Sequence, residues 1–123
     1  MGKRVLLVDD DEKLRKLLRE YLEGYGFQVL TLADGSVVIQ KIRAEAPDIV
    51  ILDIMMPKRD GYEVCQTIRT DETFKDVKII MLTAKGRTIE QEKGLALGAD
   101  AYITKPFSTK EVVDTVKAVL RGE

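Results

Sequence analysis

Short apolar runs of strand length alternate with amphipathic segments along the chain, and this alternation constrains the fold more than any other feature. Continuous apolar runs occupy residues 4–8, 49–53 and 78–83, and weaker strand candidates lie at 27–32 and 101–104. Strands that are apolar on both faces are typical of parallel sheets covered on both sides. We therefore expect five strands at these places, buried between two helical layers.

Helical periodicity fills the intervals between these strands. Apolar residues recur at helical spacing from Leu14 to Leu22 and stop near Gly24, which predicts an amphipathic helix. Weaker patterns predict four further helices over 36–45, around 62–68, over 88–97 and after Ser108, a candidate N-cap. Right-handed crossovers between such units make residues 1–123 one doubly wound α/β domain, with a parallel five-stranded sheet in the flavodoxin-like order 2-1-3-4-5.

Charge and composition exclude several classes of function. The chain has 21 acidic and 20 basic residues without a long run of one sign, which argues against binding nucleic acid or a membrane surface through bulk charge. It has no histidine, and Cys65 is its single cysteine, so histidine chemistry, an internal disulfide and a cysteine-based zinc cluster are excluded. Cys65 lies in a helical pattern and is interpreted as a small buried side chain. No apolar stretch has the length of a membrane span or signal peptide, so we expect a cytoplasmic location.

Polar residues gather where the predicted strands end. Asp9 and Asp10 follow the first strand and Asp53 ends the third, while Thr83 ends the fourth and Lys105 follows the fifth. Ligand sites in doubly wound sheets lie outside the carboxyl ends of the strands, and the first and third strands are neighbours in the expected order. We therefore expect the three aspartates to converge within a few ångströms.

Three crowded carboxylates repel one another, and burial adds to the cost of ionising them. Either some of the acids stay protonated or a cation neutralises the cluster. Because only oxygen ligands are available, a hard cation, most naturally Mg²⁺, is the physical solution. With the charge of Lys105 and the hydroxyl of Thr83, the pocket suits an anion that carries several oxygens, such as a phosphoryl group. Each residue also has an ordinary interpretation, and for Asp11 we favour a helix N-cap; the convergence of the others indicates a site.

The motifs VDDD, LDIMMPKRDG, LTAKG and GADAYITKPF resemble the receiver domain of two-component response regulators over about residues 4–121. The resemblance implies a phosphorylation-dependent signalling switch and not an enzyme. Asp53 would accept a phosphoryl group from a sensor histidine kinase or a phosphotransfer protein. Mg²⁺, or Mn²⁺ as an alternative, would be bound by Asp10, Asp53 and the backbone carbonyl of Met55, with Asp9 acting mainly through water.

The same resemblance assigns roles to the last two strands. Thr83 and Lys105 would bind phosphoryl oxygens after transfer, and the Lys105–Pro106 peptide would be cis, which only X-Pro bonds adopt cheaply. Tyr102 matches an aromatic that changes rotamer with phosphorylation, although a half-buried strand tyrosine fits equally well. The face formed by 88–97, the fifth strand and the last helix would control an output domain or a downstream protein. No direct contact with nucleic acid or membrane is expected.

Some positions depart from the pattern of the winged-helix transcription factors in this family, which dimerise through charged pairs on that face. The corresponding positions hold Ala101, Thr115, Gly122 and Gln91, which argues against this dimer mode. Stand-alone action, a different output domain or an engineered chain stay open, as does a phosphorylation-dependent homodimer. Met55 and Lys85 flank the route of attacking water in the family, and neither offers a carboxylate or amide to orient it. We therefore predict slow self-dephosphorylation, over minutes or longer.

Three other functions are compatible with this fold class. A flavin mononucleotide carrier needs a neutral, glycine- or hydroxyl-rich phosphate loop, whereas the first loop here reads DDDEK. A phosphatase with an aspartate nucleophile ordinarily carries a second aspartate two residues later, where this chain has Met55. An interaction module that had lost phosphorylation would lack part of the acid cluster, and all of it is present.

Overall fold

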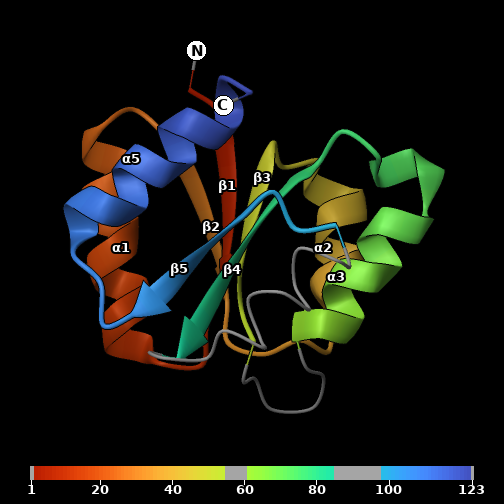
Figure 1. Ribbon diagram of the computed structural model, residues 1–123, viewed down its shortest axis with the longest axis horizontal. Helices are drawn as coiled ribbons and strands as arrows, with labels where there is room; N and C mark the ends of the chain where they lie inside the picture. Colours follow the sequence, from red (N-terminus) through yellow and green to blue (C-terminus); the bar gives the residue numbers. More distant parts are fainter. Residues whose placement is uncertain (1, 55–60, 85–97, 123) are drawn as a thin grey trace.

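A parallel five-stranded sheet in the order β2-β1-β3-β4-β5 forms the centre of the computed structural model (Figure 1), which describes residues 2–54, 61–84 and 98–122. All four strand pairs are parallel. The strands are β1 (Arg4–Val8), β2 (Gln28–Leu32), β3 (Ile49–Asp53), β4 (Lys78–Ala84) and β5 (Ala101–Lys105). The predicted fold class and strand order are therefore confirmed.

Helices cover both faces of this sheet. In Figure 1, α1 (Glu12–Gly24) and α5 (Thr109–Leu120) lie on one side, and α2 (Val38–Glu45) and α3 (Gly61–Thr70) lie on the other. A short 3₁₀ turn, η1 (Glu72–Phe74), follows α3 and was not predicted. The helix expected over 88–97 lies outside the described residues. None of the described helices is long and apolar enough to cross a membrane.

Side-chain caps determine where two of the helices begin. The carboxylate of Asp11 accepts hydrogen bonds from the first-turn amides of α1, and Ser108 caps α5 in the same way, so both predicted N-caps are confirmed. The second helix begins at Val38 and not at residue 36, because the amide and hydroxyl of Ser36 donate to the Asp34 carboxylate, at 2.8 and 2.5 Å. This local bond offers the backbone a turn in place of the first helical residues.

Two apolar clusters, one on each face of the sheet, form the core. Alternate residues of β1 and β3 belong to different clusters: Val5, Leu7, Ile49 and Ile51 pack beneath α1 and α5, whereas Leu6, Val8, Val50 and Leu52 pack beneath α2 and α3. Cys65 of α3 is fully buried, as predicted, and its burial raises the pKa of its thiol to about 11. Burial on both sides explains why these strands are continuously apolar.

One arginine joins the amino ends of β4 and β5 to the end of α3. Arg69 donates from Nε to the carbonyl of Gly98 and from Nη1 to the carbonyl of Val77, both at 2.7 Å, and its Nη2 pairs with the carboxylate of Asp100. The same carboxylate accepts from the amide of Ile79 at 2.8 Å. These bonds lie at the amino ends of the strands, whereas the predicted site lies at the carboxyl ends. Arg69 therefore stabilises the fold and is not part of the site.

Candidate metal centre

The carboxyl ends of β1 and β3 bring three carboxylates together at the end of the sheet away from both termini (Figure 1). Val8 of β1 lies in register with Leu52 of β3, so the aspartates that follow them are neighbours. One carboxylate oxygen from each of Asp9, Asp10 and Asp53 lies within 4.8 Å of the others. The convergence predicted from the sequence is confirmed.

The acid cluster is mostly buried and has a lysine as its internal counter-charge. Asp9 is completely buried and Asp53 is 5% exposed, whereas Asp10 is exposed. The Lys105 ammonium contacts one oxygen of each buried acid, at 3.3 Å from Asp9 Oδ2 and 3.1 Å from Asp53 Oδ2. Partial burial by itself would lower the pKa of Lys105, but the adjacent charges of Asp53 and Asp9 outweigh it and raise that pKa.

The turn from β1 into α1 engages Asp9 through its backbone as well as its side chain. Its amide donates to the carbonyl of Leu32 at 3.1 Å, and its Oδ1 accepts from the amide of Asp11 at 2.9 Å. Its carbonyl accepts from Nη1 of Arg15 at 2.7 Å. With Lys105 on Oδ2, all the polar groups of this buried residue are bonded, as a rigid site requires.

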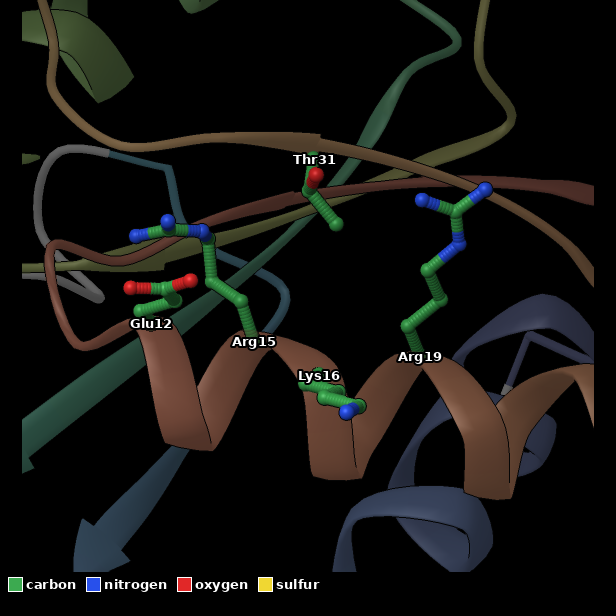
Figure 2. A pocket seen from close by; sticks show the side chains of 5 residues that line it. All are labelled: Glu12, Arg15, Lys16, Arg19 and Thr31. Atoms are coloured by element: carbon green, nitrogen blue, oxygen red, sulfur yellow. The ribbon is translucent and has the colours of Figure 1, made fainter.

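Arg15 was not identified from the sequence as part of the site. In Figure 2 its side chain rises from α1 beside Thr31 of β2, at the rim of an open hollow that Glu12, Lys16 and Arg19 also line. A basic residue on the first turns of an amphipathic helix is typical of a solvated face, so the position of Arg15 in the sequence does not indicate a contact with the site. The bond to Asp9 becomes visible only when the turn is folded.

Thr83 carries a buried hydroxyl without a hydrogen-bond partner among the described residues. The residue is 1% exposed and its Oγ1 is unsatisfied. It follows Leu82, which lies in register with Asp53, and it pairs with Thr104 of β5. An unsatisfied buried hydroxyl costs about 1–3 kcal/mol, so a group that bonded Thr83 would relieve this cost.

A glycine packs directly against the backbone of Asp53. The amide of Gly61, the first residue of α3, donates to the carbonyl of Ile54 at 3.0 Å. A Cβ at this position would lie 2.7 Å from the carbonyl oxygen of Asp53 and 2.9 Å from Cα of Ile54. This close approach to the backbone leaves no room for a side chain, which explains why glycine occupies the position.

The remaining predicted features lie on β5 or at its end, or fall outside the described residues. Tyr102 is half-buried on β5 and lies in register with Met81. It packs against the apolar core cluster beneath α2 and α3. The Lys105–Pro106 peptide is cis, as expected. Met55, Lys85 and Gln91 lie outside the described residues, so the predicted carbonyl ligand, the predicted route of water and the departure at Gln91 are not tested.

The donor set fits a hard divalent cation. It consists of carboxylate oxygens from two adjacent strand ends, the ligand type preferred by Mg²⁺, Mn²⁺ and Ca²⁺. Among the described residues, the three carboxylates face the ammonium of Lys105 and, at the Asp9 carbonyl, the guanidinium of Arg15. Negative charge is therefore in excess, and a cation would relieve this imbalance. With the unsatisfied hydroxyl of Thr83 on the neighbouring strand, the arrangement can bind a metal and an oxygen-rich anion side by side.

Comparison with known proteins agrees with this fold. Residues 5–117 match the response regulator receiver domain family. The chain is 52% identical over 118 residues to "Probable transcriptional regulator ycf27" of Guillardia theta, and 46% identical over 121 residues to the alkaline phosphatase synthesis transcriptional regulatory protein PhoP of Bacillus subtilis (strain 168). These alignments cover 96% and 98% of this chain but 45% and 50% of the relatives, so it spans about half their length.

A crystal structure from Chloroflexus aurantiacus J-10-fl superimposes with a TM-score of 0.94 at 36% identity, covering 98% of this chain and 99% of that one. The chain therefore belongs to the response regulator receiver domain family. As a receiver domain of two-component signalling, it is a regulatory phosphoacceptor domain and not an enzyme that turns over external substrates.

Proposed function

We propose that Asp53 is the phosphoacceptor and that a sensor histidine kinase or phosphotransfer protein supplies the phosphoryl group. A carboxylate oxygen of Asp53 would bond to phosphorus as the phosphorus–nitrogen bond of the phosphohistidine breaks, and the electron pair would stay on the departing imidazole. The observation that carries this proposal is the location of Asp53, at the end of a buried strand, in contact with Lys105 and within 4.8 Å of two other acids. A rigid strand end holds the nucleophile in one orientation.

Asp9, Asp10 and Asp53 would bind Mg²⁺, with Mn²⁺ as an alternative ion. The inferred set also includes the backbone carbonyl of Met55, which is outside the described residues. When bound, Mg²⁺ would offset the negative charge shared by the carboxylates and the incoming phosphoryl group. Carboxylate oxygens and a surplus of negative charge support this choice of ion.

Lys105 and Thr83 would hold the phosphoryl oxygens after transfer. The ammonium of Lys105 already contacts the Asp53 carboxylate, so after transfer it would bind an oxygen of the phosphoryl group attached to that carboxylate. The hydroxyl of Thr83 has no partner among the described residues, and a phosphoryl oxygen would satisfy it. The phosphorylated state is therefore expected to gain a hydrogen bond that the free state lacks, as a population shift requires.

Tyr102 would change its side-chain position on β5 when Asp53 is phosphorylated. Movement of Thr83 toward the phosphoryl group would leave space for the Tyr102 ring, and the β5–α5 face, with residues 88–97, would then bind an output domain or a downstream protein. The similarity to two proteins named as transcriptional regulators, of which the chain spans about half, supports an output domain. NMR spectra of Tyr102 that are identical with and without beryllofluoride would contradict this switch.

Incubation with a small phosphodonor and Mg²⁺, followed by intact mass measurement, tests the proposed function. We expect one added phosphoryl group on the wild type and none on Asp53→Asn, or on the wild type with EDTA. The added group should persist for minutes or longer if self-dephosphorylation is slow. Equal phosphorylation of Asp53→Asn would refute the assignment.

A further inference from the structure

We infer that Arg15 is a positioning residue of the cation site, acting through the backbone between Asp9 and Asp10. This inference rests on the proposed metal site, and it assigns to α1 a part in forming it. Arg15 lies six residues beyond Asp9, and its Nη1 donates to the Asp9 carbonyl at 2.7 Å. That carbonyl belongs to the peptide unit that leads into Asp10, so the bond orients the backbone from which the Asp10 side chain projects.

Asp10 needs this support more than the other two acids. Asp9 is buried and bonded through both carboxylate oxygens, and Asp53 ends a fully buried strand. Asp10, by contrast, is exposed and lies after the end of β1. On its amino-terminal side, the backbone of Asp10 is held by the Asp9 peptide, and the Arg15 bond fixes the carbonyl of that peptide.

The next turn of backbone strengthens the same connection. The amide of Arg15 donates to the carbonyl of Asp11 at 2.9 Å, and the amide of Asp11 donates to Asp9 Oδ1 at 2.9 Å. Arg15 therefore contacts the loop at two points, once through its backbone and once through its side chain. Loss of the side-chain bond would leave the Asp9–Asp10 peptide free to turn, and binding a cation would then have to order Asp10 as well.

The charge of Arg15 and its hydrogen bond have opposite consequences for cation binding. A positive charge this close to the acid cluster repels a divalent cation, so its removal would tighten binding if charge were its only effect. A positioning role predicts weaker binding when the bond is lost, and loss of an outer-shell partner typically weakens metal affinity about 10–100-fold. The sign of the change therefore separates the two roles.

The chain offers a matched control on the same helix. Arg19 lies one turn further along α1, across Thr31 from Arg15 in Figure 2, and it pairs with Glu23 at 3.4 Å. Arg19→Gln therefore removes the same charge from the same hollow without removing a bond to Asp9. Arg15→Lys keeps the charge and one donor group, and so tests whether the bond can be partly restored.

Mn²⁺ affinity of the folded chain, measured by electron paramagnetic resonance of the free ion, tests the inference. We expect Arg15→Gln to bind Mn²⁺ about tenfold more weakly, Arg15→Lys to recover part of this loss, and Arg19→Gln to match the wild type. Amide exchange of residues 9–11 in the metal-free protein should quicken in Arg15→Gln alone. Circular dichroism confirms that each variant is folded.

Arg15→Gln binding Mn²⁺ as tightly as the wild type, or more tightly, would overturn the inference. If that happened while the wild type still bound Mn²⁺ and accepted a phosphoryl group, only the role of Arg15 would fail. If the wild type bound no Mn²⁺, the proposed cation site would fail, and the role of Arg15 with it.

Discussion

Replacing Asp10 with asparagine should stabilise the metal-free protein, although Asp10 is a proposed ligand. Its carboxylate lies within 4.8 Å of those of Asp9 and Asp53. At that distance two unit charges repel by about 0.9 kcal/mol in water and about 3.5 kcal/mol at an effective dielectric constant of 20. Asp10 is exposed, so the lower figure applies to each of its two pairs. The lost attraction to Lys105 offsets part of this gain.

The net gain is therefore about 1 kcal/mol in the free energy of unfolding, or about 3–6 °C in melting temperature for a domain of this size. In Mg²⁺ the order of stability should invert. A ligand at one hundred times its dissociation constant stabilises the folded state by about 2.7 kcal/mol, and Asp10→Asn should lose most of this gain. The wild type should then be more stable than the variant.

Urea unfolding in EDTA and in excess Mg²⁺ measures both differences. Asp11→Asn is the matched control: it removes the neighbouring charge, and asparagine can still cap α1, so it should not stabilise the metal-free protein. An Asp10→Asn variant that is less stable than the wild type in EDTA would contradict the electrostatic reasoning. A variant that gains as much unfolding free energy from Mg²⁺ as the wild type does would contradict the role of Asp10 as a ligand.

Four further predictions follow from single positions. Thr83→Val removes an unsatisfied buried hydroxyl at nearly constant volume, so thermal melting should show equal or higher stability, by up to about 1 kcal/mol, while the Tyr102 NMR response to beryllofluoride is lost. Gly61→Ala introduces a Cβ at 2.7 Å from the Asp53 carbonyl and should cost about 1–3 kcal/mol in urea unfolding, with slower phosphorylation of Asp53. Arg69→Ala leaves its carbonyl and carboxylate acceptors without their donor and should cost about 2–3 kcal/mol in the same assay. Cys65 should resist thiol reagents until urea unfolds the chain. Because its thiol stays protonated in the folded state between pH 9 and about 11, stability relative to Cys65→Ala should fall as the pH rises through that window.

Much of the fold could be predicted because each strand carries its own signal. β1, β3 and β4 are continuously apolar since both faces of the sheet are covered, and the caps at Asp11 and Ser108 act within one helical turn. α2 begins two residues later than its pattern predicts, because Ser36 has a local alternative to the helix in its bond to Asp34. Local patterns therefore predict that a helix or strand is present more reliably than they predict the residue at which it begins.

The acid cluster could also be predicted, because the topology rule places the ends of β1 and β3 together. The contacts that support the cluster and the sheet could not be predicted from the sequence. The bond from Arg15 to the Asp9 carbonyl, the approach of Gly61 to the Asp53 backbone and the bonds from Arg69 to Gly98 depend on the reach and packing of groups after folding. A surface arginine or a loop glycine has the same sequence signature whether or not it makes such contacts.

Chemical mapping of the phosphorylated residue tests the central claim most directly. After reaction with a small phosphodonor, borohydride converts an aspartyl phosphate to homoserine, which peptide mass spectrometry locates in the sequence. The account predicts homoserine at position 53 when phosphodonor and Mg²⁺ are both present, and aspartate there when either is omitted. Homoserine at Asp9 or Asp10 with Asp53 unchanged, or no homoserine under any condition, would contradict it.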